Sequence, residues 1–329
     1  MPYPSRRPIV LALALAATLA GCGGSGRSQT QGAPAPSTAS TVKPSTLAAP
    51  KAQTAGPAHI IVVVEENHSY EQIIGNPAAP FLNQLASRGT VLSNYYAISH
   101  PSLPNYLAMT SGDTQGISSD CPRCEVAADN LGGQLERAGI SWKAYQQGLP
   151  GPCSNVPNAG DYARKHDPFM YYDGVRSGSG CSSRVVPATQ LDADVAGGAL
   201  PRFAFVTPDL SHDMHGNGGR SDDQLVASAD AWLRGFYEQL TASPAWRQDT
   251  RLVVTFDEGS GGGSSGCCGG LAQGGHVLTL VSGPHVPTGQ DARAYSHYSL
   301  LRSIEAAFRL PYLRHAADPA TATIPVLAS

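Results

Sequence analysis

Short apolar, β-branched segments alternate with helical patterns along this 329-residue chain, and that alternation leaves few folds open. Segments that are apolar, rich in Val and Ile and followed by turn residues are typical of buried strands. They are His59–Val64, Phe203–Val206, Arg251–Phe256 and His276–Ser282, with a weaker fifth at Ser141–Tyr145. The helical patterns are Pro80–Arg88, Asp129–Ala138, Asp222–Leu240 and Ser296–Phe308. We therefore expect an α/β domain with a largely parallel central sheet flanked by helices.

The composition excludes several other classes of protein. Charged residues make up 14% of the chain and the formal net charge is −3, so we expect no nucleic-acid partner. A hydrophobic content of 41% is too high for a chain that is disordered throughout. Beyond the N-terminus, no apolar run reaches the ~18 residues that indicate a membrane-spanning helix.

The N-terminus has the layout of an export signal. Two arginines precede the apolar stretch Ile9–Ala20, and small residues follow it. The tetrapeptide Leu19–Cys22 resembles the lipobox of bacterial lipoproteins, in which the cysteine carries the lipid. We therefore interpret residues 1–21 as a lipoprotein signal peptide and Cys22 as the lipidation site.

Residues 22–57 separate that signal from the first predicted strand. They are rich in Gly, Ser, Pro and Thr and contain almost no large apolar side chain, which is typical of a flexible tether. The globular domain would then span residues 58–329. This layout predicts an exported protein that faces the periplasm or the cell exterior and contacts the membrane through its lipid anchor only.

Six cysteines remain after the lipobox, and an even number in an exported protein favours disulfides. Six cysteines allow 15 pairings, of which Cys121–Cys124 and Cys153–Cys181 are the economical local choices. A structural zinc site is the alternative, although no second C-x-x-C pair follows at the usual distance.

Polar residues follow three of the predicted strands directly. Glu66 and Asn67 come after the first strand, His212–His215 lie beyond the second, and Asp257 and Glu258 follow the third. In open α/β sheets, ligands bind at the carboxyl ends of the strands, so these residues are expected to converge. The side-chain oxygens of Glu66, Asn67, Asp257 and Glu258 suit one hard divalent ion such as Ca²⁺, Mg²⁺ or Mn²⁺. Helix capping or surface charge is the simpler explanation for any one of these groups taken alone.

Ser102 is the candidate nucleophile. Pro101 and Pro104 restrict the backbone on both sides of it and can hold its hydroxyl in one direction. A serine hydroxyl is a weak nucleophile that needs a base or a metal to activate it. No G-x-S-x-G motif surrounds Ser102, which disfavours a hydrolase triad with this serine, so we expect Ser102 to be a metal ligand as well. The alternative is a proline-rich loop with a helix cap.

Six motifs occur in order between His59 and Pro311. They are Glu66-Asn67, His100–Tyr106, Lys165–Phe169, Pro208-Asp209 with Asp213–His215, Thr255–Gly259, and Ser296–Leu301. Together they resemble the bacterial phosphoesterase family, which joins acid phosphatases and phospholipases C within the alkaline phosphatase superfamily. This resemblance implies an alkaline phosphatase-like fold for nearly the whole domain.

The resemblance also implies roles for individual residues. Ser102 would be the metal-bound nucleophile, and Asn105 would touch a phosphate oxygen. His166 and His215 would lie against the phosphate, where we expect them to be cationic below neutral pH, since an unperturbed histidine has a pKa of roughly 6.5. One of them could protonate the leaving alcohol. The remaining metal ligands would be Glu66, Asn67, Asp257 and Glu258.

These inferences predict a metal-dependent acid phosphatase that hydrolyses phosphomonoesters through a Ser102 phosphoenzyme, with phosphoinositides among the candidate substrates. A phospholipase C-type phosphodiesterase that uses the same centre is one alternative. A surface-anchored binding lipoprotein without activity is another. The loop Gly259–Gly270 near the site could be a lid or a plain connection, and the latter is the simpler expectation.

Overall fold

The computed structural model describes residues 56–260 and 266–328. The predicted signal peptide, Cys22 and all but the last two residues of the tether lie outside this range, as does the centre of the Gly259–Gly270 loop. Among the residues described, no helix is both long enough and apolar enough to cross a bilayer.

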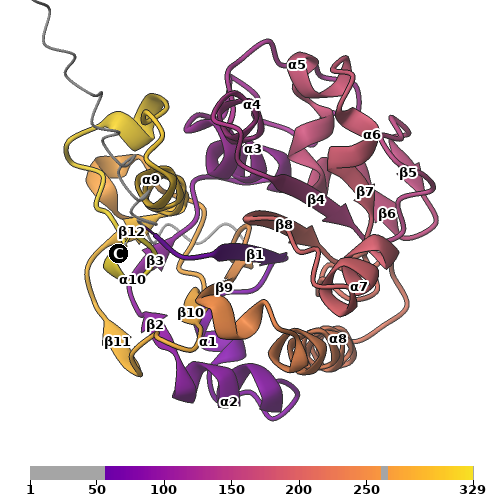
Figure 1. Ribbon diagram of the computed structural model, residues 1–329. Coiled ribbons are helices and arrows are strands. Elements are labelled where there is room, and N and C mark those ends of the chain that lie inside the picture. Colours follow the sequence, from indigo (N-terminus) through magenta and orange to yellow (C-terminus); the bar gives the residue numbers. More distant parts are fainter. Residues whose placement is uncertain (1–55, 261–265, 329) are drawn as a thin grey trace, which may run out of the picture. The chain divides into compact units, whose positions relative to one another are not determined.

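A central sheet of eight strands organises the domain (Figure 1). From one edge to the other it contains β11 (Gly289–Asp291), β2 (Thr90–Leu92), β10 (Leu280–Ser282), β9 (Thr250–Phe256), β1 (His59–Glu65), β8 (Phe203–Thr207), β4 (Trp142–Gln146) and β7 (Val185–Pro187). All neighbours pair in parallel except β10, which is antiparallel to both β9 and β2. The predicted largely parallel sheet is confirmed.

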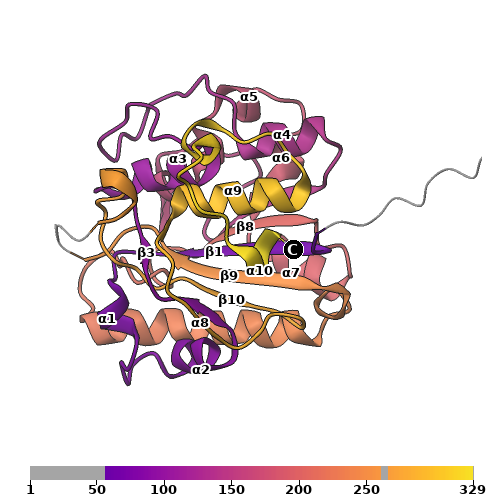
Figure 2. The same ribbon diagram turned by 90° about the vertical axis from the view of Figure 1, so that its left-hand side faces the viewer.

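Helices cover both faces of this sheet. In chain order they are α1 (Tyr70–Ile73), α2 (Pro80–Arg88), α3 (Ser102–Ser111), α4 (Leu131–Arg137), α5 (Asp173–Arg176), α6 (Cys181–Arg184), α7 (Thr189–Ala196), α8 (Asp222–Ala242), α9 (His297–Phe308) and α10 (Pro325–Ala328). Figure 2 shows α3, α4 and α9 on one side of the sheet and α2 and α8 on the other. Short pairs, β3 (Tyr95–Tyr96) with β12 (Tyr295–Ser296) and β5 (Asn158–Ala159) with β6 (Tyr162–Ala163), lie outside the main sheet.

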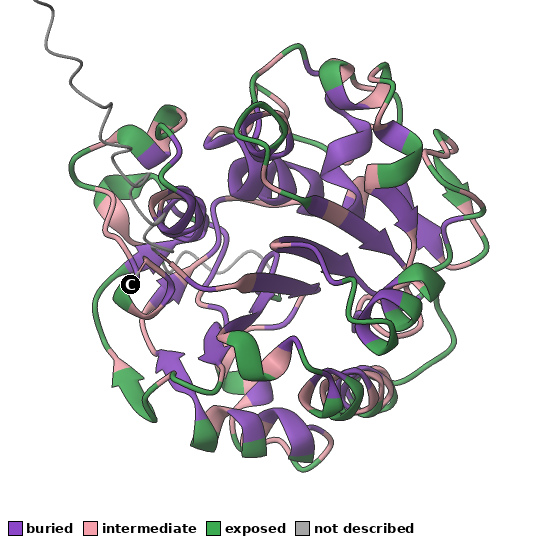
Figure 3. Ribbon diagram, in the orientation of Figure 1, coloured by how far each residue is buried: buried purple, intermediate pink, exposed green. Residues whose placement is uncertain are grey.

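The central strands are buried on both faces, as the purple strands of Figure 3 show. Ile60–Val64 of β1 are at most 1% exposed, and the flanking strands β8 and β9 are likewise buried. A strand with helices on both sides has no solvent-facing side chains, so it shows a continuous apolar run instead of alternation. This is why the sequence pattern predicted these strands within one or two residues.

The predicted strand at His276–Ser282 is shorter than expected. Only its last three residues form β10, because the preceding segment pairs with the chain just before α3. Gln273 N–H donates to Ile98 O at 2.9 Å, and Val277 N–H donates to Tyr95 O at 3.0 Å. This pairing places the segment from Gln273 to Val277 beside residues 95–98, which shortly precede Ser102 in the chain. The sequence analysis did not predict β2, β7, β11 or α7, whose short lengths carry little pattern.

The six cysteines of the domain form three disulfides. Two of them are the expected pairs, Cys121–Cys124 and Cys153–Cys181. The third joins the adjacent residues Cys267 and Cys268. A cysteine-based zinc site is therefore not needed to account for these residues.

Candidate active site

The register between β1 and β9 brings the predicted acidic residues together. Glu65 pairs with Phe256, and Asp257 N–H donates to Glu65 O at 2.9 Å, so Glu66 and Asp257 leave the sheet side by side. On the other side of β1, Glu66 N–H donates to Asp213 O at 2.8 Å. The polar clusters after three strands therefore meet at one edge of the sheet, as predicted.

Ser102 is the first residue of α3 and is 1% exposed. Its Oγ donates a hydrogen bond to Glu66 Oε2 at 3.0 Å. One turn later on the same helix face, the Tyr106 hydroxyl donates to Glu66 Oε1 at 2.6 Å. Both oxygens of Glu66 are thus bound by α3. Since a helix N-terminus carries a partial positive charge, this position favours an anion.

Asp257 has one satisfied and one free oxygen. Its Oδ1 accepts hydrogen bonds from Asn67 N–H at 3.1 Å and from Glu258 N–H at 2.6 Å. The first bond depends on the left-handed backbone of Asn67 (φ 57°), a conformation that Asn tolerates well. Asp257 Oδ2 is buried and has no hydrogen-bond partner in the part of the chain that the structure describes.

These carboxylates repel one another in a buried environment. Burial raises the pKa of Glu66, and the charges of Asp257 and Asp213 raise it further. Burial and the charge of Glu258 raise the pKa of Asp257, and burial raises that of Asp213 to about 7. Buried anions are costly unless a cation compensates them. With the free Asp257 oxygen, this cluster fits a divalent ion with oxygen ligands.

A second set of donors overlaps the first. One ligand atom each from Glu66, His166 and His215 lies within 4.8 Å of the others, so this group could also hold a metal ion. Nitrogen ligands favour a transition metal over Ca²⁺ or Mg²⁺. However, Lys165 Nζ donates to His215 Nε2 at 3.0 Å and occupies the lone pair that a metal would need.

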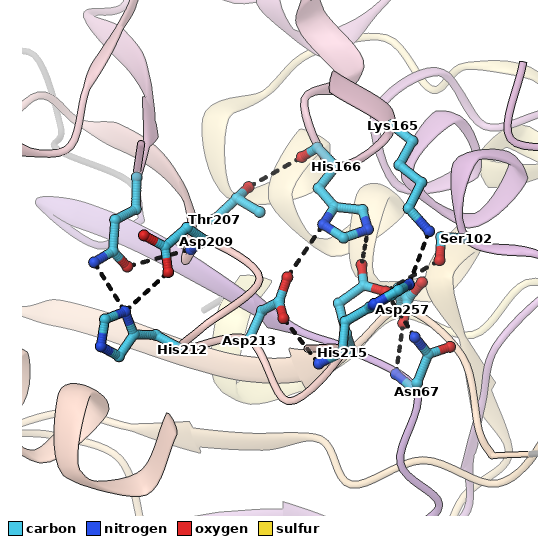
Figure 4. A network of polar contacts seen from close by, with 12 residues as sticks. Asn67, Ser102, Lys165, His166, Thr207, Asp209, His212, Asp213, His215 and Asp257 are labelled. Atoms are coloured by element: carbon cyan, nitrogen blue, oxygen red, sulfur yellow. Dashed lines mark hydrogen bonds and ion pairs between the residues drawn. The ribbon is translucent and has the colours of Figure 1, made fainter. Parts of the chain in front are cut away.

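His166 lies between two carboxylates and is buried. Its Nε2 is 3.1 Å from Glu66 Oε1, and its Nδ1 is 3.2 Å from Asp213 Oδ2 (Figure 4). Burial lowers the pKa of His166, and the nearby charge of Lys165 lowers it further. The expectation that His166 is cationic is therefore corrected, because burial disfavours the charged imidazole.

Lys165 is the positive charge that the sequence analysis missed. It precedes His166 in a short 3-10 helix (Arg164–His166), and Figure 4 shows it reaching toward Ser102 and His215. Its Nζ also contacts Asp120 Oδ2 at 3.0 Å. Burial alone would lower the pKa of Lys165, but attraction to Glu66 and the bond to Asp120 outweigh burial and raise it. The motif Lys165–Phe169, one of the six that resemble the phosphoesterase family, contains this lysine and was the only sequence signal for its role.

His215 has a defined tautomer. Its Nδ1 lies 2.7 Å from Gly216 O, to which it can only donate, and its Nε2 accepts from the Lys165 ammonium. His215 is therefore bound as the neutral Nδ1–H form in this arrangement. In the expected cationic form, His215 Nε2 would also carry a hydrogen and would point it at the Lys165 ammonium, which cannot accept it.

Asn105 lies in the first turn of α3, and its side-chain amide is fully used by the backbone before and at the start of that helix. Its Oδ1 accepts from Ile98 N–H and Ser99 N–H at 2.9 and 3.0 Å. Its Nδ2 donates to Ser99 O and Pro101 O at 2.8 and 3.2 Å. Asn105 thus holds the loop that precedes Ser102, whereas a contact with phosphate was expected.

Two further histidines pair with the end of β9. His100 Nδ1 lies 2.7 Å from Glu258 Oε2, and this hydrogen bond raises the pKa of His100. His297 Nε2 donates to Asp257 O at 2.6 Å, while Nδ1 accepts from Tyr95 OH at 3.0 Å. Burial lowers the pKa of His297 to about 4, so it is a neutral residue that holds the backbone of the site.

The fold is shared with solved structures of low sequence identity. A protein of the alkaline phosphatase superfamily from Vibrio parahaemolyticus aligns with a TM-score of 0.55 at 15% identity, over 80% of this chain and 72% of that one. This similarity confirms the expected alkaline phosphatase-like fold.

Sequence relatives cover most of the described domain. The chain is 35% identical to the phosphatidylinositol-3-phosphatase of Mycobacterium tuberculosis over 264 residues, which are 79% of this chain and 80% of that protein. It is 30% identical to an acid phosphatase of Aspergillus fumigatus over 256 residues, 75% of this chain and 54% of the fungal protein. A model of the Phosphoesterase family matches residues 76–311. The chain therefore belongs to the Phosphoesterase family, as its motifs predicted.

Proposed function

We propose that this protein is a metal-dependent acid phosphatase that hydrolyses phosphomonoesters through Ser102. The observation that carries the proposal is the position of the Ser102 hydroxyl, at the N-terminus of α3 and hydrogen-bonded to a buried carboxylate cluster. The two relatives, a phosphatidylinositol-3-phosphatase and an acid phosphatase, support the same class of reaction.

The proposed metal ligands are the oxygen-rich set Glu66, Asn67, Ser102, Asp257 and Glu258. The free Asp257 oxygen supports this set over the one that includes His215, whose Nε2 accepts from Lys165. A divalent ion held there supplies a positive charge that activates a hydroxyl and offsets charge on phosphoryl oxygens.

In the proposed reaction, Ser102 Oγ bonds to phosphorus while the bond from phosphorus to the alcohol oxygen breaks. The Ser102 proton is already directed at Glu66 Oε2. His166 and His215 border the phosphate position, and His166, whose Nε2 lies 3.1 Å from Glu66 Oε1, relays the Ser102 proton from Glu66 to the leaving alcohol. Water then cleaves the phosphoserine and releases phosphate. Because phosphoryl transfer depends mainly on positioning and electrostatics, the rigid N-terminus of α3 is the main contribution of the fold.

The experiment that tests this proposal compares two aryl substrates on the purified, metal-loaded protein. A phosphomonoesterase hydrolyses p-nitrophenyl phosphate faster than bis-p-nitrophenyl phosphate, and a diesterase shows the reverse. No turnover of either substrate, with metal bound, would contradict the proposal and favour a binding protein. Phosphatidylinositol phosphates in vesicles are the next substrates to compare, given the name of the mycobacterial relative.

A further inference from the structure

Lys165 is the one lysine that reaches the site among the described residues, and its ammonium has a donor to spare. An ammonium group has three N–H donors. In the described part of the chain, Nζ contacts two acceptors, Asp120 Oδ2 and His215 Nε2, both at 3.0 Å. The side chain is 21% exposed, so the remaining donor is accessible to a small ligand.

Asp120 connects this lysine to the nucleophile. While Oδ2 holds Lys165, Oδ1 accepts a hydrogen bond from Leu103 N–H at 3.0 Å. Leu103 directly follows Ser102 in the first turn of α3, where backbone N–H groups have no partner within the helix. The Asp120 carboxylate therefore links the Lys165 ammonium to the first turn of α3, which begins at Ser102. The Cys121–Cys124 disulfide begins at the next residue and restrains the same loop.

The charge of Lys165 matters because of what surrounds it. Buried acidic side chains line the site, namely Glu66, Asp213 and Asp257, and an incoming phosphate ester brings further negative charge to it. A fixed cation stabilises a ligand with two negative charges more than a ligand with one. A phosphomonoester carries up to two charges on its phosphoryl group, whereas a phosphodiester carries one.

We propose that Lys165 binds a phosphoryl oxygen and makes the site selective for phosphomonoesters over phosphodiesters, with Asp120 as the residue that positions it. This inference rests on the proposed function, because it names the specificity determinant of that site. It predicts a change in the ratio of two activities, which a purely structural role would not produce.

The test measures kcat/KM for p-nitrophenyl phosphate and for bis-p-nitrophenyl phosphate, together with inhibition by inorganic phosphate. Lys165→Met should lower monoester kcat/KM roughly 10- to 100-fold, the effect of one charge-assisted hydrogen bond, and weaken phosphate inhibition similarly. Diester kcat/KM should fall much less. Lys165→Arg should restore part of the monoester preference, because the charge returns with a different shape.

Asp120→Asn separates the two functions of Asp120. The amide oxygen can still accept from Leu103 N–H, but the charge that holds Lys165 is lost. We expect a rise in monoester KM with kcat less affected, and a melting temperature close to that of the wild type. If Lys165→Met folds poorly, Asp120→Asn still reports the effect of a misplaced Lys165 ammonium on monoester binding.

Lys143 provides a matched control. Its side chain is 23% exposed and its Nζ pairs with Asp194 Oδ2 at 2.5 Å, on β4 and α7. Lys143→Met should leave the ratio of the two activities unchanged. If Lys165→Met keeps the wild-type ratio and phosphate inhibition, the inference is wrong while the proposed function stands. If the wild-type protein hydrolyses neither substrate, the proposed function fails first.

Discussion

Ser102 Oγ and Glu66 Oε2 are 3.0 Å apart although 36 residues separate them, and the hydroxyl donates to the carboxylate. Glu66 directly follows strand β1, and Ser102 is the first residue of helix α3 on one face of the sheet. Their contact unites the proposed nucleophile with a proposed metal ligand.

Replacing Ser102 with alanine should abolish turnover and preserve metal binding. We expect kcat for an aryl phosphate to fall at least about 1000-fold, because no other hydroxyl occupies the N-terminus of α3. Mass spectrometry of acid-quenched wild-type enzyme should locate a phosphoryl group on Ser102. Ser99→Ala is the control, since within residues 56–260 and 266–328 the Ser99 hydroxyl bonds only to the neighbouring His100 carbonyl. A phosphopeptide elsewhere would identify a different nucleophile.

Asp257→Asn should weaken metal binding and activity together. The substitution keeps the shape of the side chain but removes the charge that the buried Oδ2 carries. We expect the metal dissociation constant to rise at least roughly 10-fold, measured by titration of metal-depleted protein. Asp194→Asn, in the distant pair with Lys143, should leave metal affinity unchanged. Full activity in a metal-free sample would refute the proposed metal site.

Asn105→Ala should reduce stability as well as activity. The Asn105 amide makes four hydrogen bonds with the backbone of the loop before Ser102, and each contributes roughly 1 kcal/mol. We expect the free energy of unfolding to fall by about 2–4 kcal/mol in denaturant titration. Asn158→Ala, at an exposed position, should have little effect. If Asn105 only contacts phosphate, activity will fall with no loss of stability.

Glu305 should make stability depend on pH. Burial raises the pKa of its carboxyl to about 8, and Oε1 accepts from Leu313 N–H at 3.0 Å. Between an unfolded pKa of about 4.5 and the folded value, the native state holds more protons than the unfolded state, so stability falls as pH rises. The slope from this group is at most about 1.4 kcal/mol per pH unit.

Glu305→Gln should remove that slope. The amide keeps an oxygen for Leu313 N–H and never ionises, so the variant should gain stability over the wild type as pH increases from 5 to 8. Urea titrations across this range measure the difference. Glu238→Gln, on the exposed surface of α8, is the control and should show a constant difference. An unchanged pH profile for Glu305→Gln would show that Glu305 ionises normally.

The proposed lipid anchor can be tested independently of the catalytic domain. Cys22→Ala should move the enzyme from the membrane fraction to the soluble exported fraction, because a lipobox cysteine is the attachment point of the lipid. Activity against a soluble aryl phosphate should not change, since residue 22 precedes the domain. Continued association with membranes would contradict the lipoprotein assignment.

The central strands and most of the acidic cluster could be predicted from the sequence for one physical reason. A strand buried on both faces needs a continuous apolar run, and parallel neighbours bring their carboxyl ends to one edge. The positions of Glu66 and Asp257 were predictable from this rule, because each residue directly follows one of two neighbouring parallel strands. The long helices α2, α8 and α9 were also predicted within about two residues, because each has a periodic apolar face.

The supporting residues could not be predicted because they come from segments without periodicity. Asp120 lies in a loop and Lys165 in a 3-10 helix, and their contact depends on the tertiary path of the chain. The role of Asn105 also differed from the expectation, because a side chain that holds its own loop has the same sequence spacing as one that faces a ligand. The charge of His166 depends on burial, which a sequence motif does not report.

The pairing of β1 with β9 makes catalytic activity a measure of native folding. Asn67 N–H and Asp257 Oδ1 are 190 positions apart, so the site does not exist until the middle of the sheet has closed. Side chains alternate between the two faces of a strand, so a slip of one residue would put Glu65 in the place of Glu66. Glu65 is fully buried and neither of its oxygens has a hydrogen-bond partner among the described residues. Such a slip would leave the charge inventory unchanged yet break the contact of Asn67 N–H with Asp257 Oδ1, so turnover reports strand alignment that composition and net charge cannot.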